Sequence, residues 1–493
     1  MNIAGLAKNI VDNLRALSLD LAKTDIETAL LVANSYGKTL SANYIGILSD
    51  NEFEFQLSEY FSELLINRRH QADYDILHLV TTGYASGGHT RVVERFLNAG
   101  TGDGIASLDP LPIDVINELP TNVKLFNGVK QPTGLATISK ILDIGLKFKS
   151  VILHIHPDDI LSTIAGILLA KLDVKLFMYN HADHMFSFGY GAAERIFEIS
   201  KYGWMLGEMR EIKHKQSYVG IPAPEINIIN NSHKNNKKVH IFMAGNSNKF
   251  KPWGSYSVPD FINQVYENDF LRDKVKFSLC GPTGREYYWK ELKAENLDNV
   301  EFLGLQHHKK FIELLSESDC YIDSFPQGNG TAFVESIMLN IPSFGLNLLA
   351  GSSYADLLRS NSTSEIINSL VDYINNKDLI KNNLINVRKN IITEQSIENC
   401  SNRLTLSMKK ETFLIPDYLA SMNYVPFFHE RLWKDSGRII IDYDLLSKLS
   451  LSNKLKLIKC WSNISYCNYN SLLTYLATRI KCIFQNLLNH ITT

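Results

Sequence analysis

Strand-like apolar runs alternate with helical patterns over most of this chain, and the alternation restricts the folds open to it. The first unit spans 74–97, where the run ILHLV meets a glycine-bearing loop and the helical pattern TRVVERFL follows. The same order recurs in SVILHIHPDDILSTIAGILLAKL, and the strand KLFMY leads into a polar loop. Strand, loop and helix in this order indicate a parallel sheet covered by helices, an α/β domain.

A polar stretch without an apolar face interrupts the pattern at 221–238 and predicts a linker. A second series of strands follows it, in VHIFMAG, VKFSLCG, VEFLG, CYIDSF and IPSFGL. The expected fold class is therefore α/β, with two Rossmann-like domains facing a central cleft. We place these domains at 71–230 and 231–400.

The two ends of the chain differ from this core. Residues 1–70 repeat apolar positions at helical spacing and predict a helical region, with Gly37 and Gly46 in its connections. We expect a helical extension over 401–493, whose aromatic first part packs back across the first domain. Residues 445–493 contain six Lys or Arg and no Asp or Glu. This basic amphipathic tail predicts either contact with an anionic membrane surface or a cap over the second domain.

Composition narrows the classes of protein further. A length of 493 residues predicts two or three domains, and a formal net charge of −2 argues against a nucleic-acid partner. The six cysteines form no CxxC pair, which indicates reduced thiols. No uncharged apolar run reaches the roughly 18 residues needed to cross a bilayer. We expect a cytoplasmic protein, with any membrane contact at the inner face of the plasma membrane.

Ligands of open parallel sheets bind at the carboxyl ends of the strands, so the loops that follow strands are the candidates. In GYASGGHTR, Gly87 and Gly88 allow the backbone to approach a ligand closely. His89 is a candidate general base or a candidate hydrogen-bond donor to a phosphate group. The spacing fits neither a dinucleotide fingerprint nor a P-loop. The alternative is a tight turn that His89 caps.

A second candidate group lies in YNHADHMF, which contains His181, Asp183 and His184. A carboxylate beside imidazoles fixes a tautomer and raises basicity, as a general base requires. A metal site is the rival interpretation, although no remote motif completes a ligand set. A polar surface turn is the third. In LHIHPDD, His154 and His156 alternate along a strand, and we expect at least one of them to be structural.

The second domain offers a cationic loop and a glycine loop. Asn246, Lys249 and Lys251 follow the strand VHIFMA, and Gly281 follows VKFSLC. A lysine at such a position supplies positive charge for a phosphate, although Lys251 is better explained as a solvated side chain. The glycine loop PQGNGTA precedes a helix whose N-terminus favours an anion. Its candidate residues are Gln327, Gly328, Asn329, Gly330 and Thr331.

Glu335 lies one helical turn beyond that loop. Its carboxylate is placed to accept hydrogen bonds from a ribose diol while phosphates rest on the loop. Capping of the helix by Thr331 is a simpler interpretation and is compatible with the first.

These motifs together resemble glycosyltransferases of the GT-B fold over residues 74–400. The stretch SDCYIDSFPQGNGTAFVESIMLNIPSFGL resembles the donor region of glycosyltransferase family 4, where an acidic residue at the position of Glu335 binds ribose. FPQGNGTAFVE and GNSNKFKP resemble family 41 more closely, the family of O-GlcNAc transferase and bacterial protein N-glucosyltransferases, in which a lysine at the position of Lys249 binds the diphosphate. Gln327 stands where retaining family 4 enzymes have a second glutamate, so the stereochemistry is left open.

The resemblance implies transfer of a sugar from a nucleotide-diphosphate sugar, bound by the 231–400 domain, to an acceptor on the 71–230 domain. The implied acceptor is a glycan or lipid-linked glycan of bacterial surface polysaccharide (O-antigen, capsule or lipopolysaccharide), with a protein as the alternative. No DxD motif is present in a suitable loop, so neither a metal nor a cofactor is expected. Either His89 or the group formed by His181, Asp183 and His184 would be the base. A nucleotide-sugar epimerase or an inactive binding subunit is a further alternative.

Overall fold

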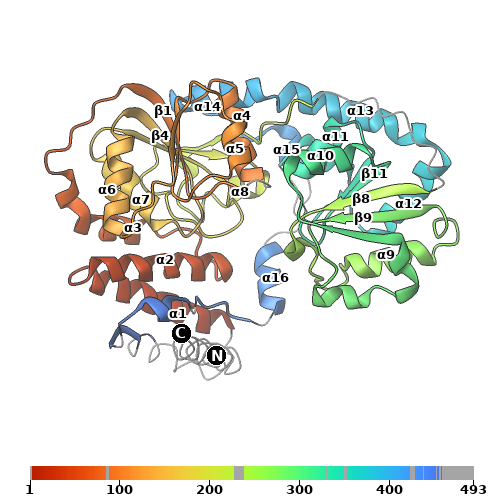
Figure 1. Cartoon of the computed structure of the whole chain (residues 1–493), viewed down its shortest axis with the longest axis horizontal. Helices are drawn as coiled ribbons and strands as arrows, with labels where there is room; N and C mark the ends of the chain where they lie inside the picture. The colour runs from red at the N-terminus through yellow and green to blue at the C-terminus, as the bar shows by residue number, and fades with distance from the viewer. Residues whose placement is uncertain are drawn as a thin grey trace, which may run out of the picture.

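Two α/β lobes lie side by side in the computed structural model, with a pair of helices beneath the first lobe (Figure 1). The structure describes residues 3–84, 88–226, 238–328, 330–348, 352–421, 428–436, 438–442, 444–450, 452–454 and 457. Each lobe is built around a parallel sheet, so the predicted α/β class is confirmed. Of the expected linker, residues 221–226 have no regular secondary structure, and residues 227–237 lie outside the described part of the chain.

The first lobe contains, in its described residues, a seven-stranded parallel sheet in the order β3-β2-β1-β4-β5-β6-β7. The strands are β1 (Tyr74–Val80), β2 (Gly104–Ser107), β3 (Lys124–Asn127), β4 (Phe148–His154), β5 (Lys175–Tyr179), β6 (Arg195–Glu198) and β7 (Gln216–Tyr218). The helices are α4 (Gly88–Asn98), α5 (Ile113–Asn117), α6 (Gly134–Gly145), α7 (Ile160–Ala170), α8 (Lys201–Met205) and the 3-10 turn η2 (Lys213–Lys215). Apolar runs such as VILH in β4 suit a sheet covered on both faces.

The second lobe contains, among the residues described, six strands in the order β10-β9-β8-β11-β12-β13. The strands are β8 (Val239–Ala244), β9 (Val275–Cys280), β10 (Val300–Gly304), β11 (Cys320–Asp323), β12 (Ser343–Leu346) and β13 (Arg359–Ser360). The α-helices are α9 (Val258–Glu267), α10 (His308–Ser316), α11 (Thr331–Met338), α12 (Thr363–Asn375) and α13 (Lys377–Glu394). The 3-10 turns are η3 (Ser247–Phe250), η4 (Tyr287–Glu291), η5 (Ala294–Asn299) and η6 (Tyr354–Leu358).

The N-terminal helices pack against the first lobe. They are α1 (Ile3–Leu21), α2 (Ile26–Ala42), α3 (Asn51–Ser58) and the 3-10 turn η1 (Glu59–Leu65). The prediction that Gly37 lies in a connection is wrong, because Gly37 is inside α2. A Cβ there would lie 2.5 Å from the Phe188 ring and 2.9 Å from Asp158 Cα. The glycine therefore allows close contact with the first lobe rather than a turn.

After the second lobe the chain returns to the first lobe and the N-terminal helices. This segment contains α14 (Ile397–Met408), α15 (Asp417–Ser421), α16 (Phe428–Ser436) and α17 (Asp444–Lys448). In α14, Cys400 and Leu404 pack in one cluster with Phe177 of the first lobe. Trp433 in α16 donates a hydrogen bond from Nε1 to Asn43 Oδ1 at 3.1 Å, just beyond α2. Most of the basic tail predicted at 445–493 lies outside the described residues.

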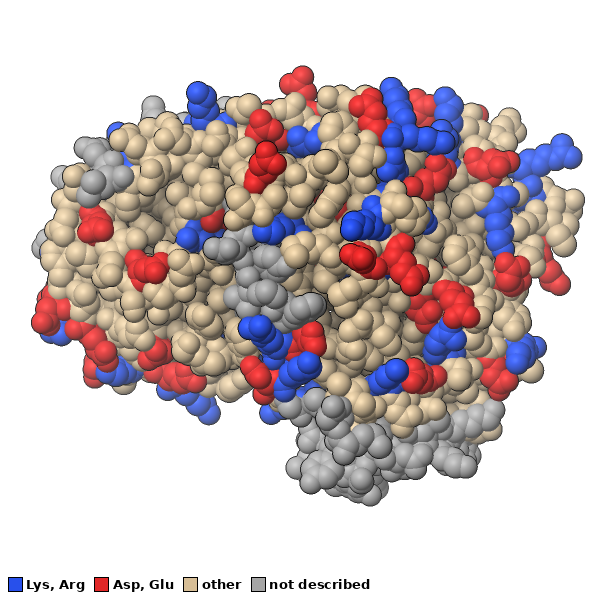
Figure 2. All heavy atoms as spheres, turned by 180° about the vertical axis from the view of Figure 1, so that it is seen from behind, with Lys and Arg blue, Asp and Glu red and all other residues tan. Residues whose placement is uncertain are grey.

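Lys and Arg side chains alternate with Asp and Glu side chains over the face shown in Figure 2, in keeping with the net charge of −2. Within the described part of the chain, every helix is too short or too polar to cross a bilayer.

Candidate functional site

A cavity of about 620 Å³ lies between the two lobes and is lined by loops that follow β1, β5, β8, β9 and β11. Its volume is within the range of small-molecule sites, roughly 300–1,000 Å³. The predicted residues that line it are Gly88, His89, His181, Asp183, His184, Asn246, Lys249, Gly281, Gly328, Gly330, Thr331 and Glu335. Gln327 is described but does not line the cavity, whereas Gly87 and Asn329 lie outside the described residues.

The loop between β11 and α11 forms part of the cavity wall on the second lobe. Gly330 is the N-cap residue of α11 and provides no side-chain cap, and Thr331 is the first helical residue rather than the cap. The positive end of the helix dipole therefore lies at the cavity, where it favours an anion. A Cβ at Gly88 would lie 2.6 Å from Thr331 Cγ2. The start of α4 thus meets the start of α11 directly.

Lys249 lies beside this loop. Its Nζ donates a hydrogen bond to the carbonyl of Gly328 at 3.1 Å. Burial lowers the pKa of Lys249; the Asp323 carboxylate opposes this effect and the Arg359 guanidinium adds to it. A Cβ at Gly328 would lie 2.9 Å from Asp323 Oδ2, which only glycine avoids. A cation, a glycine backbone and a helix N-terminus thus converge on one wall.

The other predicted residues of the second lobe have structural tasks as well. The Asn246 side chain caps η3. Gly281 has φ +115°, and a Cβ there would collide with the carbonyl oxygen of Gly245. The Gln327 amide N–H is 3.4 Å from the Lys249 carbonyl, to which it donates. Gln327 therefore joins the two loops through its backbone and is not among the residues that line the cavity.

Glu335 is buried and lies in an ion pair between the lobes. Its Oε1 accepts hydrogen bonds from Arg95 Nη2 at 3.0 Å and from His308 Nε2 at 3.1 Å. Burial alone would raise the pKa of Glu335, but the hydrogen bond from His308 and the charge of Arg95 together hold it below its ordinary value. Sequence reasoning missed both partners, because Arg95 belongs to α4 of the other lobe and His308 to α10.

Asp183 and His184 form a carboxylate–imidazole pair at the cavity wall. His184 Nδ1 is 3.1 Å from Asp183 Oδ1, and it donates because a carboxylate only accepts. The other oxygen, Asp183 Oδ2, accepts from Ser200 Oγ. The His184 ring stacks on His429 of α16 with centroids 4.1 Å apart. This arrangement leaves the lone pair of His184 on Nε2.

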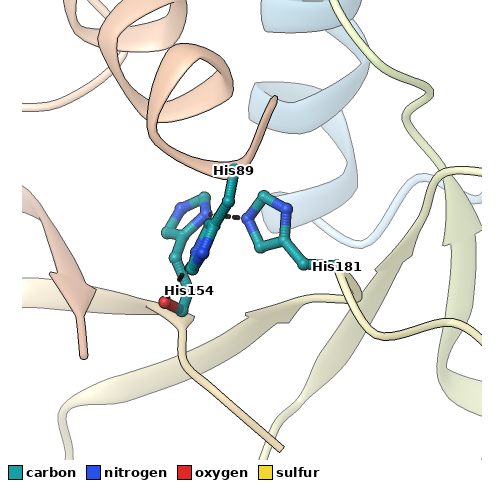
Figure 3. A group of neighbouring side chains, drawn as sticks. All are labelled: His89, His154 and His181. Carbon is teal, nitrogen blue, oxygen red and sulfur yellow. Dashed lines mark hydrogen bonds between the residues drawn. The ribbon is translucent and has the colours of Figure 1, made fainter. Parts of the chain in front are cut away.

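His89 and His181 belong to a different group, which they form with His154 (Figure 3). His89 Nε2 donates to the His154 carbonyl at 2.9 Å, and His154 Nδ1 lies 2.8 Å from His181 Nε2. Burial, and after it the neighbouring histidines, lowers the pKa of each ring, to about 4 for His89. One ring nitrogen from each residue lies within 4.8 Å of the others. Packing thus brings remote partners to His181 that the sequence spacing did not reveal.

Arg359 is a further cavity residue that the sequence did not reveal. It opens the short strand β13, and its guanidinium pairs with Asp323 at 2.9 Å and with Asp356 at 2.6 Å. The Asp356 contact lies within three residues of Arg359, but the cavity position depends on β13 pairing with β12. No local spacing signals that pairing.

No protein-family model matches the sequence, and neither does any curated protein. Solved structures do match. HepE of Anabaena in complex with UDP aligns with a TM-score of 0.51 at 13% identity, over 68% of this chain and 100% of that chain. Its complex with UDP-glucose gives 0.50 at the same identity and coverage. A mutant O-GlcNAc transferase of Thermobaculum terrenum gives 0.49 at 11% identity, over 88% of this chain and 82% of that chain.

The fold is GT-B. The two parallel sheets of this chain match those of the HepE structures, which confirms the predicted arrangement of two Rossmann-like domains. At these identities the likeness shows the fold alone, and the assignment to family 4 or family 41 stays a prediction.

Proposed function

We propose that this chain is a glycosyltransferase that takes its sugar from a nucleoside-diphosphate sugar bound between the lobes. The observation that carries the proposal is the convergence of Lys249, the Gly328 backbone and the start of α11 on one wall of the cavity. A diphosphate requires positive charge, backbone N–H groups and room for close approach, and these elements supply them.

The proposed donor is a UDP-sugar. HepE, which has the same fold, has been solved with UDP and with UDP-glucose, which supports uridine nucleotides as the first donors to test. Glu335 would accept hydrogen bonds from the ribose hydroxyls. Arg95 and His308 favour its ionised form, and that form is the stronger acceptor.

Transfer breaks the bond between the anomeric carbon and the diphosphate oxygen, and the electron pair leaves with the diphosphate. Lys249 and the N–H groups of α11 would stabilise the negative charge that develops there. The acceptor nucleophile bonds to the anomeric carbon, and its proton passes to His184 Nε2. Asp183 holds the His184 tautomer that makes Nε2 the base. Such a direct displacement inverts the anomeric configuration.

The proposed acceptor is a glycan or lipid-linked glycan of a bacterial surface polysaccharide, made at the cytoplasmic face of the membrane. Its support is the basic amphipathic pattern of 445–493 in the sequence. The full chain is then expected to sediment with anionic vesicles and not with neutral ones. Equal recovery with both would contradict the membrane part of the proposal.

The donor assignment is tested by incubating the full chain with a panel of nucleotide sugars and measuring released nucleotide and sugar products. We expect slow release of UDP from one UDP-hexose, faster release with glycan or protein acceptor fractions, and loss of release in Lys249→Met. Lys251→Met is the matched control, because Lys251 is exposed outside the cavity and should retain the rate. Epimer formation without UDP release, or no release from any donor, would contradict the proposal.

A further inference from the structure

Three imidazoles from separate elements of the first lobe meet in one group (Figure 3), and those of His89 and His181 line the cavity. His89 lies at the start of α4, His154 ends β4, and His181 follows β5. One ring nitrogen of each lies within 4.8 Å of the others. The proposed transfer uses none of the three, so the cluster requires its own explanation.

A chain of hydrogen bonds that ends at the Thr101 carbonyl shows which nitrogen of each ring carries the proton. His78 Nε2 lies 2.7 Å from the Thr101 carbonyl and must donate to it, so His78 Nδ1 carries a lone pair. That lone pair accepts from His154 Nε2 at 2.9 Å. The lone pair of His154 is therefore on Nδ1, where His181 Nε2 donates to it at 2.8 Å.

His89 is fixed in the same way. Its Nε2 donates to the His154 carbonyl at 2.9 Å, which leaves its lone pair on Nδ1. His89 and His154 thus each have one nitrogen that donates a hydrogen bond and a lone pair on the other nitrogen, and the lone pair of His154 is the one that accepts the His181 N–H. Histidines that bind metals are oriented in this manner, through a second nitrogen that donates to a carbonyl or another acceptor.

We propose that His89, His154 and His181 bind a divalent transition-metal ion, with Zn²⁺ as the expected occupant. Neutral imidazoles are its usual nitrogen ligands, and three of them leave a fourth position open. Because His89 and His181 line the cavity, that position lies on the cavity side, where water or an acceptor oxygen can reach it. The proposal does not rest on glycosyl transfer, and it departs from the sequence interpretation, which expected no metal.

Metal binding needs one small rearrangement. The ion takes the place of the proton between His181 Nε2 and His154 Nδ1, and His181 carries its N–H on Nδ1 instead, so no net proton is released. Ligand atoms around tetrahedral zinc are about 3.4 Å apart, given Zn–N bonds of about 2.1 Å. The pair at 2.8 Å therefore separates slightly, and the third ring closes in.

The test uses the untagged full chain, stripped with a chelator, equilibrated with Zn²⁺ alone and desalted. We expect about one equivalent of zinc per chain, and visible absorption bands of tetrahedral Co²⁺ when cobalt replaces zinc. In His154→Ala, and in His89→Ala at the more accessible helix start, bound zinc should fall below about a tenth of an equivalent. Circular dichroism of each variant establishes that it is folded.

His156→Ala is the matched control, because His156 follows the same strand but is outside the cluster, and it should bind zinc like the wild type. A wild type that binds no more zinc than folded His89→Ala would overturn the proposal, as would equal loss in His156→Ala. UDP affinity of the metal-free chain is measured separately, so failure of the donor site and failure of the metal site are distinguished.

Discussion

Glu335 has a buried carboxylate that pairs with Arg95 of the other lobe and with His308. In the proposed complex it contacts ribose and not phosphate. Glu335→Gln should therefore weaken UDP binding about tenfold, the value of one charge-assisted hydrogen bond. Binding of inorganic pyrophosphate should change little. Calorimetry with both ligands is the measurement, and an equal loss for both would mean that Glu335 acts by shaping the loop.

His184 is the residue on which the chemical step depends. His184→Gln should lower UDP release from the active donor by at least about 100-fold, since a positioned base contributes roughly 10²–10⁴. Affinity for UDP should stay within about twofold of the wild type. If UDP affinity falls as far as the rate, His184 supports the structure of the site and is not the base.

The hydrogen-bond partners of His154 could not be predicted from the sequence. Its position on a strand was evident from the sequence, but its partners were not. β1 and β4 pair in parallel with Val80 opposite His154, which brings His78 to its ring. The start of α4 supplies His89 and the loop after β5 supplies His181. Sheet order and register decide such contacts, and neither can be read from local spacing.

Helix α3 is joined to the first lobe by the buried carboxyl group of Glu54. Glu54 Oε1 accepts from the Gly189 N–H at 3.0 Å. Burial is the main reason that the pKa of Glu54 rises to about 8 from an ordinary 4.5. The folded state holds the Glu54 proton more tightly than the unfolded state does. The contribution of protonated Glu54 to the free energy of unfolding is therefore complete below pH 4.5 and is lost as the pH rises towards 8.

Glu54→Gln should remove this dependence, because the amide resembles the protonated acid. Between pH 5 and 8, the free energy of unfolding of the wild type should fall relative to that of the variant by about 1.4 kcal/mol per pH unit. Urea unfolding at several pH values measures the difference. Parallel curves for the two proteins would show that Glu54 is ionised in the folded state.

The longer strands were predictable, whereas the three- and four-residue strands β2, β3, β6 and β7 of the first lobe were missed because so few residues carry no clear pattern. Every strand of the second lobe expected from the sequence is present, because apolar runs followed by turn residues identify buried parallel strands. β13 was missed because two residues carry no pattern. The glycine loop before α11 was also placed correctly. Gly37 was misplaced, since a glycine that permits close helix packing has the same local signature as one in a turn.

Asn43 joins the C-terminal segment that contains Trp433 and Ile440 to the N-terminal helices, far away in the sequence. Its Oδ1 accepts from Trp433 Nε1 and from the Ile440 N–H, and its Nδ2 donates to the Ile440 carbonyl. Asn43→Ala leaves these groups unpaired, each at a cost of about 1–3 kcal/mol. We expect a lower melting temperature and faster tryptic cleavage of residues 428–450, with UDP affinity unchanged.

Asn382→Ala is the control for this prediction, since Asn382 is exposed on α13. It should change neither the melting temperature nor the cleavage. If Asn43→Ala behaves like the control, the C-terminal segment is not anchored through Asn43.

In the proposed function, the cavity between the lobes binds a nucleoside diphosphate through Lys249 and the start of α11. Titration calorimetry of UDP against wild-type, Lys249→Met and Lys251→Met proteins measures this binding. We predict that the wild type and Lys251→Met bind UDP equally and that Lys249→Met binds about 10- to 100-fold more weakly, the value of a charged hydrogen bond. Equal UDP binding by all three proteins, or none by the wild type, would contradict the claim.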